Sequence, residues 1–364
     1  MKVNYVDPLR LTIAPYDLKT GPDGVELSPL QGAGDPAWPY LSPPWIDGHT
    51  HCFYAVTSFG LKPDDIGLNT GVHLVVDAGS VGAETLKAFR EFIVDQSQTM
   101  VRAFLNVSSI GHVTMHEYFD QRLVDAERAA RAVLDNRDIL LGIKVRSSGI
   151  IVEGLGTWPL QKGLEAAQSV GCPLLVHMGE CPPSNEEILP LLRGGDIATH
   201  CFHGKEKPLW NADGTPIPAL KDALARGVQL DVGHGAASFD RDMARGALAT
   251  GFKDFSISTD LHSRNVHGCV RTLPDTMTKF LALGMPLEYV IRSVTAIPAA
   301  RFGLTAWCAH PAQKATLFRL SDAGPGDQML TDSLKKPIAA SKRIVPIAVI
   351  KDGRMIEIGA GSLS

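Results

Sequence analysis

The stretch PWIDGHTHC, residues 44–52, joins a short apolar run to two histidines that stand one residue apart. In a β-strand, residues i and i+2 share a face, so His49 and His51 would point to the same side near the C-terminal end of a strand. Such a pair binds a metal only if other parts of the chain supply further ligands. The remaining sequence therefore decides between a metal site and two neighbouring structural histidines.

Seven further β-prone runs follow, and amphipathic stretches such as DAERAARAVLDN and PLQKGLEAAQSVG lie between them. The runs read GVHLVVDAG, VRAFLNVSS, ILLGIKVR, PLLVHMG, IATHCFHG, VQLDVGHG and DFSISTDLH. Ser184 and Glu187 have the spacing of a capping box at the start of another helix. Strands that alternate with helices predict an α/β fold with a parallel (β/α)8 barrel of the TIM type.

The two ends of the chain differ from this pattern. Residues 1–43 are rich in Pro and Gly and contain one strand candidate, RLTIA, whereas residues 306–364 contain β-prone segments such as IVPIAVIKDG. We expect residues 1–43 and 306–364 to pair into a small β-sandwich domain. Residues 44–305 would then form the barrel, which would carry the functional site.

Composition excludes several classes of partner. The 364 residues are 45% hydrophobic and 20% charged, with a net charge of −4 and both signs scattered, which argues against nucleic-acid binding. No apolar run approaches the roughly 18 residues of a membrane span, and the N-terminus lacks the apolar core of a signal peptide. The six cysteines form no CxxC pair, which indicates free thiols and a cytoplasmic protein. Homo-oligomer formation is left open.

Metal-ligand side chains fall near the C-terminal ends of the predicted strands, where barrel enzymes build their active sites. They are His49, His51, Lys144, His177, His200 and Asp260. Lys144 follows an apolar run, where an ammonium group without a partner is costly. An amine that adds carbon dioxide becomes a carbamate anion, which can bridge two cations as a carboxylate does.

The pieces DGHTH, GIKVR, LLVHMGE, ATHCFHG and SISTDLH, spread over residues 47–262, resemble in this order the motifs of the amidohydrolase superfamily of binuclear metal hydrolases. THCFHG, DVGHG and STDLH are similar to its amidohydrolase/deacetylase, or dihydroorotase-like, branch. The resemblance implies two divalent ions, with Zn²⁺ favoured and Mn²⁺, Co²⁺ or Fe²⁺ able to occupy the same ligands. The implied ligands are His49, His51 and Asp260 for one ion, His177 and His200 for the other, and carbamylated Lys144 with a hydroxide between them.

The resemblance further implies that a metal-bridged hydroxide cleaves the amide or ester bond of an acylated small molecule, of the N-acyl amino acid or O-acyl hydroxy acid type. Asp260 would be the general acid–base. Two enzymatic alternatives stay open: a cyclic amidohydrolase of the lactamase or dihydroorotase type, and a mononuclear deaminase that would use Glu180. Lys144 favours the binuclear hydrolase over the deaminase, and the complete ligand set disfavours a barrel that only binds or scaffolds.

Four residues are candidates for substrate contact. Arg146 shares its strand face with Lys144 and could bind a substrate carboxylate in bidentate fashion. His234 follows VQLDV, and His262 shares parity with Asp260. His203, three residues beyond His200, is the weakest candidate. The remaining histidines, which carry no motif, are expected to be structural or exposed: His73, His112, His116, His267 and His310.

Overall fold

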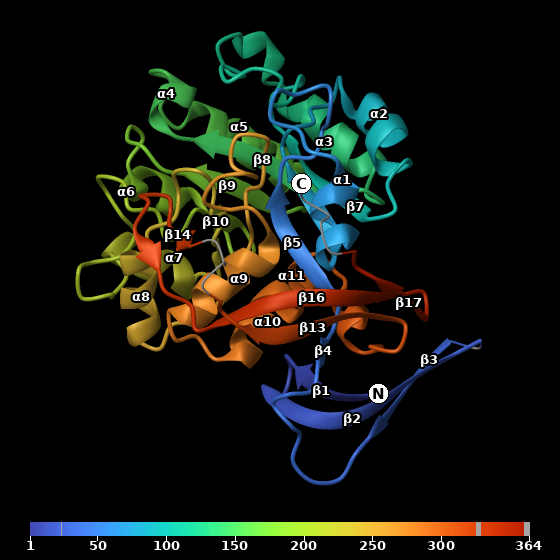
Figure 1. Cartoon of the computed structure of the whole chain (residues 1–364). Helices are drawn as coiled ribbons and strands as arrows, with labels where there is room; N and C mark the ends of the chain where they lie inside the picture. The colour runs from blue at the N-terminus through green and yellow to red at the C-terminus, as the bar shows by residue number, and fades with distance from the viewer. Residues whose placement is uncertain (23, 325–328, 360–364) are drawn as a thin grey trace.

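The computed structural model describes residues 1–22, 24–324 and 329–359, and it contains the predicted parallel barrel (Figure 1). Eight strands are hydrogen-bonded to one another in sequence order. They are β5 (Trp45–Thr50), β6 (Val72–Ala78), β7 (Met100–Asn106), β8 (Leu140–Ser147), β9 (Leu174–Met178), β10 (Ile197–Thr199), β11 (Gln229–Asp231) and β12 (Phe255–Ser256). All eight runs that the sequence predicted as barrel strands are confirmed.

The barrel closes where the segment after β12 meets β5. Thr50 forms an isolated parallel bridge with Leu261. The amide of His51 donates to the carbonyl of Leu261 at 2.8 Å, and the amide of Asp260 donates to the carbonyl of His49 at 2.7 Å. This closure places Asp260 beside the two histidines of the first barrel strand.

Helices surround the barrel (Figure 1). The α-helices are α1 (Pro63–Ile66), α2 (Leu86–Phe89), α3 (Ala126–Asp135), α4 (Gly149–Val152), α5 (Trp158–Ser169), α6 (Asn185–Ile188), α7 (Pro218–Ala225), α8 (Arg241–Ala249), α9 (Leu273–Ala282), α10 (Leu287–Val294) and α11 (Ala296–Arg301). The 3-10 and π-helical segments are η1 (Leu68–Thr70), η2 (Arg90–Val94, a π-helix), η3 (Gln121–Leu123), η4 (Leu189–Leu191) and η5 (Thr305–Cys308). The predicted capping box of Ser184 and Glu187 is present at the start of α6. None of the helices in the described ranges has the length and apolar character needed to cross a bilayer.

A second sheet draws its strands from both ends of the chain and lies below the barrel in Figure 1. Its order is β17 (Arg354–Glu357), β16 (Lys342–Lys351), β13 (Lys314–Asp322), β4 (Tyr40–Ser42), β1 (Lys2–Asp7), β2 (Thr12–Gly21) and β3 (Gly24–Pro29). A separate pair consists of β14 (Leu330–Thr331) and β15 (Pro337–Ile338). The domain boundaries at 43/44 and 305/306 stay predictions.

The N-terminal part of this sheet corrects the sequence analysis, which expected a single strand before residue 44. Four strands are present there. Val3, Leu18 and Val25 are buried together with Leu317 from β13, so the apolar residues are spread thinly over short strands. Pro and Gly in the intervening turns hide this pattern in the sequence.

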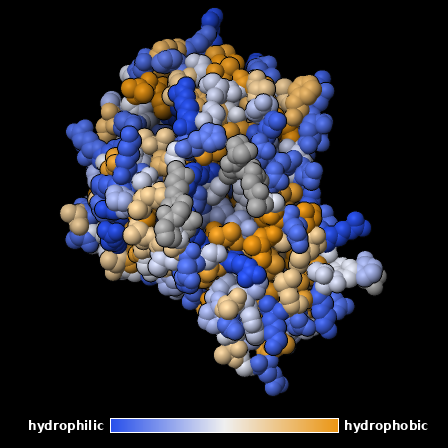
Figure 2. Space-filling view, viewed as in Figure 1, coloured by the Kyte–Doolittle hydropathy of each residue, from blue (hydrophilic) through white to orange (hydrophobic). Residues whose placement is uncertain are grey.

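Apolar packing fills the end of the barrel that faces away from the functional residues. Ile46, Leu74, Val76, Phe104 and Leu175 form one buried cluster, and each of them lies at least two residues before the C-terminal end of its strand. Polar side chains therefore collect toward the opposite, C-terminal end, as in other barrels of this type. On the outer surface, hydrophilic residues cover most of the face shown in Figure 2.

Candidate metal centre

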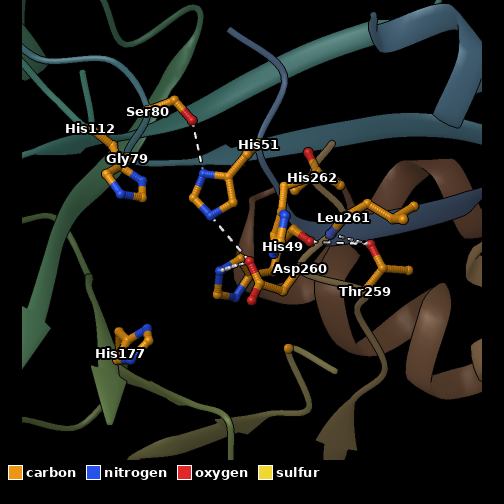
Figure 3. A network of polar contacts seen from close by, with 12 residues as sticks. His49, His51, Gly79, Ser80, His112, His177, Thr259, Asp260, Leu261 and His262 are labelled. Carbon is orange, nitrogen blue, oxygen red and sulfur yellow. Dashed lines mark hydrogen bonds and ion pairs between the residues drawn. The ribbon is translucent and has the colours of Figure 1, made fainter. Parts of the chain in front are cut away.

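Residues from opposite sides of the barrel meet at the C-terminal end of the strands. The Asp260 Oδ1 atom lies 3.1 Å from His51 Nε2 and 3.4 Å from His49 Nε2. His200 Nε2 lies 2.9 Å from His177 Nδ1, and ligand atoms of His49, His200 and Asp260 are all within 4.8 Å of one another. Figure 3 shows His49 and His51 beside the Asp260 carboxylate, with His177 farther from it.

His200 and Asp260 differ slightly from their expected positions, which were inside or at the end of a strand. His200 follows β10 directly, and Asp260 lies four residues beyond β12. Their φ angles are +69° and +52°, in the left-handed region that non-glycine residues seldom adopt. Residues with such backbone angles cluster at functional sites, where the surrounding structure holds them in place.

Three imidazoles are oriented by hydrogen bonds at Nδ1. His51 Nδ1–H donates to Ser80 Oγ at 2.8 Å, and His200 Nδ1–H donates to the carbonyl of Gly233 at 2.6 Å. His49 Nδ1–H donates to Thr199 Oγ1 at 2.9 Å. Each ring therefore presents the unprotonated Nε2 to the shared centre, which is the tautomer that binds metal.

The contact between His49 and Thr199 continues to a buried carboxylate. Thr199 Oγ1 donates to Asp231 Oδ2 at 2.7 Å, and Ser258 Oγ donates to the same oxygen at 2.7 Å. Asp231 thus holds His49 in place through the hydroxyl group of Thr199. Carboxylates behind ligand histidines fix ring orientation and raise ligand basicity in metal sites.

Lys144 is almost fully buried on β8, and its amine has no hydrogen-bond partner among the described residues. Its side chain passes over Gly79, where a Cβ atom would lie 2.5 Å from Lys144 Cγ, so glycine is required there. Burial lowers the pKa of Lys144 to about 7, which favours the uncharged amine. His177 Nε2 is likewise buried without a partner. Unpartnered buried polar atoms are costly, and bound cations would account for both.

The protonation states of the histidines also favour metal binding at this centre. Burial lowers the pKa of His49, His177 and His200, so neutral rings are favoured. Neutral imidazoles with one carboxylate are a donor set that suits Zn²⁺ and related divalent ions.

A cavity of about 340 Å³ opens onto these residues, near the lower end of the ~300–1,000 Å³ found for small-molecule sites. It is lined by His49, His51, Phe59, His112, Met115, Lys144, Arg146, Ile150, Ile151, His177, Glu180, Lys205, Ala236, Ala237, Ser238, Asp260, His262 and Arg264. Of the four predicted substrate residues, Arg146 and His262 belong to this lining. His203 and His234 do not.

His234 and His203 are instead buried beside the cavity. His234 Nε2 accepts a hydrogen bond from the Lys279 amine at 2.8 Å, and its ring stacks on Phe239. His203 is 1% exposed, and its Nδ1 accepts from the amide of Lys205 at 3.3 Å. Packing and hydrogen bonding within the protein thus occupy the ring of His234, whereas His203 is buried with its Nε2 atom unpartnered among the described residues.

His112, which the sequence analysis treated as structural or exposed, lines the cavity. Its ring stacks on Phe59 at a centroid distance of 4.9 Å and lies 5.5 Å from the ring of His51. It lies well beyond the end of β7, in a loop without a motif, so strand parity carried no information about it. The position of Phe59 could not be predicted either, because Phe59 lies in an irregular loop after the first barrel strand.

Arg146 is already paired within the protein. Its Nε donates to Glu117 Oε1 at 2.5 Å, Nη2 donates to the other oxygen of the same carboxylate, and Glu117 is 0% exposed. The backbone amide of Arg146 also donates to the Tyr118 hydroxyl at 2.9 Å. This buried bidentate pair occupies the guanidinium that the sequence analysis assigned to a substrate carboxylate.

We expect Arg146→Met to destabilise the fold by about 3–5 kcal/mol, because Glu117 would be left buried and unpaired. Urea unfolding followed by circular dichroism measures the change. The double variant Arg146→Met/Glu117→Leu should recover most of the lost stability, since no buried charge remains. A single variant as stable as the wild type would show that the pair is not buried in solution.

The fold and the centre can be compared with known proteins. No protein-family model matches the chain. Among curated relatives, a deacetylase of Agrobacterium fabrum is 37% identical over 264 residues, which span 72% of this chain and 65% of that protein. A deacetylase of Enterococcus faecalis is 36% identical over 328 residues, which cover 87% of each chain. The chain thus spans somewhat less than two thirds of the Agrobacterium relative.

Solved structures give the same placement. A crystal structure of a dihydroorotase is 31% identical with a TM-score of 0.82, covering 98% of this chain and 97% of that chain. A crystal structure of an adenine deaminase is 31% identical with a TM-score of 0.85, covering 98% of this chain and 99% of that one. The chain belongs to the amidohydrolase superfamily. Within it, the curated relatives place the chain beside the deacetylases.

Proposed function

We propose that the chain is a metal-dependent hydrolase that cleaves the amide or ester bond of an acylated small molecule. The observation that carries this proposal is the Lys144 amine, which is buried next to four imidazoles and a carboxylate and has no hydrogen-bond partner in the described part of the chain. A deacetylase removes an acyl group from nitrogen or oxygen, so the curated relatives support the bond type. The N-acyl amino acid or O-acyl hydroxy acid expected from the sequence is the proposed substrate type.

The proposed ligands are His49, His51, Lys144, His177, His200 and Asp260. The uncharged amine of Lys144 is the form that adds carbon dioxide, and the resulting carbamate would supply a bridging anion. When bound, the divalent ions would polarise a carbonyl group and lower the pKa of water to about 7. Zn²⁺ is favoured by the imidazole-rich set, and Mn²⁺, Co²⁺ or Fe²⁺ would also be accepted.

Asp260 is the proposed general acid–base. Its carboxylate faces the cavity and is ionised, so it can take a proton from the water that attacks the acyl carbon. It then returns that proton to the nitrogen or oxygen whose bond to the acyl carbon breaks. The hydrogen bonds of Ser80, Thr199 and Gly233 to the ligand histidines hold the rings in place throughout.

A hydrolysis screen of N-acetyl and O-acetyl acids, both enantiomers, tests the proposal when metal content is measured on the same sample. We expect about two metal equivalents per chain, cleavage of acyl substrates, and loss of activity after chelation that returns with added metal. Metal-loaded protein that cleaves no acyl bond would contradict the proposed function.

Deamination is the second candidate function, and the similarity to the crystal structure of an adenine deaminase supports it. It would need Glu180 to protonate a ring nitrogen. Glu180 Oε1 lies 2.6 Å from the Lys205 amine, and the Ser148 hydroxyl donates to its other oxygen. Burial acts to raise the pKa of Glu180, but these hydrogen bonds outweigh it and lower the pKa to about 2. A carboxylate held in this way is a poor proton donor, and ammonia release from adenine would contradict this reasoning.

A cyclic amidohydrolase differs from the proposed enzyme only in substrate shape, and the dihydroorotase neighbour supports it. Cyclic ureides and lactams in the same screen separate the two. The cytoplasmic location, the absence of nucleic-acid and membrane partners, and homo-oligomer formation stay predictions.

We expect Thr199→Val to weaken metal affinity by about 10–100-fold, because His49 loses the hydroxyl that orients it and Asp231 loses a donor. Competition with a chromogenic chelator measures the affinity. The matched control is Thr250→Val at the exposed end of α8, which should bind metal like the wild type. Equal affinities in both variants would contradict a role of Thr199 in orienting the histidine.

A further inference from the structure

The cations that line the cavity differ in whether the protein neutralises them. The Lys205 amine is paired with Glu180 at 2.6 Å, and Arg146 is paired with the buried Glu117. Arg264 is exposed at the mouth, and no carboxylate of the described residues lies within ion-pair distance of its guanidinium. It is therefore the cation in the lining that is left to bind an anion from solution.

Arg264 is nevertheless held in position. The centre of its guanidinium lies 4.3 Å from the centroid of the Phe59 ring, a cation–π distance. Phe59 in turn stacks on His112, and His112 lies against the proposed ligand His51. This series of rings forms a wall that connects Arg264 with the metal centre.

The backbone around Arg264 is fixed to the same centre. The Asn265 side chain donates to the carbonyl of Asp260 at 2.7 Å, and the amide of Arg264 donates to His262 Nδ1 at 3.2 Å. The arginine thus follows the proposed general acid–base by only four residues, on a turn that internal hydrogen bonds define. This turn therefore determines how far the guanidinium lies from the proposed metal centre.

Another part of the lining is apolar. Ile150, on the short helix α4, is 71% exposed although it lines the cavity, and Ile151 and Met115 lie in the same lining. A large exposed aliphatic side chain at a cavity mouth is suited to contact an apolar part of a ligand. The cavity therefore offers a metal centre, one unpaired guanidinium and an apolar surface.

We propose that Arg264, rather than Arg146, binds the substrate carboxylate and sets the preference for acylated acids. This inference rests on the proposed hydrolase function. In an N-acyl amino acid or O-acyl hydroxy acid, the carboxylate carbon is two bonds from the acylated atom. A carboxylate on the guanidinium therefore keeps the acyl group near the centre, and the side chain of the acid faces Ile150.

Matched substrate pairs test this assignment. For Arg264→Met we expect kcat/KM for an N-acetyl amino acid with an apolar side chain to fall by about 10–100-fold, mainly through KM, because a charge-assisted bidentate contact is lost. For the corresponding primary amide, which lacks the carboxylate, kcat/KM should change by less than about threefold. Arg264→Lys should retain part of the preference for the acid over the amide, because lysine keeps the positive charge but lacks the planar guanidinium that binds a carboxylate in bidentate fashion.

A second exposed arginine serves as the control for the loss of a positive charge. Arg10→Met, at a side chain that is 83% exposed in the turn between β1 and β2, should match the wild type on both substrates. Equal loss on acid and amide, or no loss on the acid, would overturn the assignment of Arg264. A wild type that cleaves acid and amide equally well would overturn it too, while the hydrolase function stands. Failure of the wild type to cleave either would contradict the proposed function itself, and the inference with it.

A binding measurement serves as a second readout that does not depend on turnover. The free carboxylic acid product should bind the metal-loaded wild type more tightly than it binds Arg264→Met, by calorimetry at equal metal content. Thermal unfolding of both proteins shows whether the variant is folded. Equal product affinity in two folded proteins would overturn the assignment.

Discussion

The variant Asp260→Asn should keep its metal and lose about 10²–10⁴-fold in kcat. The amide oxygen of asparagine can still face His49 and His51, whose Nε2 atoms lie 3.4 and 3.1 Å from the carboxylate oxygen in the native chain. The amide cannot take up a proton near neutral pH, so the attacking water and the leaving group lose their proton carrier. Metal analysis and steady-state kinetics on the same preparation measure both quantities.

The leaving group gives this prediction a second test. An amide nitrogen leaves poorly unless it is protonated, whereas an activated ester leaves without help, so the loss should be greater for amides. Asp254→Asn, at a carboxylate that is 75% exposed and paired with Arg292, serves as the matched control and should be unaffected. A rate close to that of the wild type on amides would remove Asp260 from the chemistry.

The barrel could be predicted because β-prone runs alternate with amphipathic stretches. Which side chains share a face could be predicted because successive residues of a strand point to opposite faces. His49, Lys144 and His177 lie within strands, where this parity holds. His200 and Asp260 follow their strands in left-handed conformations, so strand parity does not fix their direction, although the sequence placed both near the ends of predicted strands. The N-terminal strands were missed because their apolar residues are few and turns interrupt them.

The substrate side of the cavity could not be predicted in this way. His112 and Arg264 lie on loops that have no regular period, so their direction depends on contacts with Phe59 that only the folded chain brings together. The pairing of Arg146 with Glu117 was hidden for the same reason, because Glu117 precedes β8 in an irregular segment. Strand periodicity therefore predicts the proposed metal ligands more readily than the residues proposed to determine substrate preference.

Replacement of Lys144 by methionine should have opposite effects on activity and on the stability of the metal-free protein. The native amine is buried with no partner among residues 1–22, 24–324 and 329–359, so an apolar side chain of similar length should stabilise the metal-free fold by about 1–3 kcal/mol. The same change removes the group that would carry the bridging carbamate. The activity should then fall by at least the ~10²–10³-fold seen when one transition-state donor is removed. Unfolding of the metal-free proteins and kinetics of the metal-loaded ones measure the two effects.

Lys279→Met provides the matched control, because Lys279 is also fully buried but its amine donates to His234 Nε2 at 2.8 Å and to the carbonyl of Cys269 at 2.5 Å. Loss of these bonds should destabilise the chain, in contrast to Lys144→Met. Reconstitution of metal-free wild type should also depend on bicarbonate, since carbon dioxide must add to the amine before the ions are held. If Lys144→Met binds two metal equivalents and turns over like the wild type, or if carbon dioxide-free buffer reconstitutes the wild type equally well, the bridging carbamate is wrong.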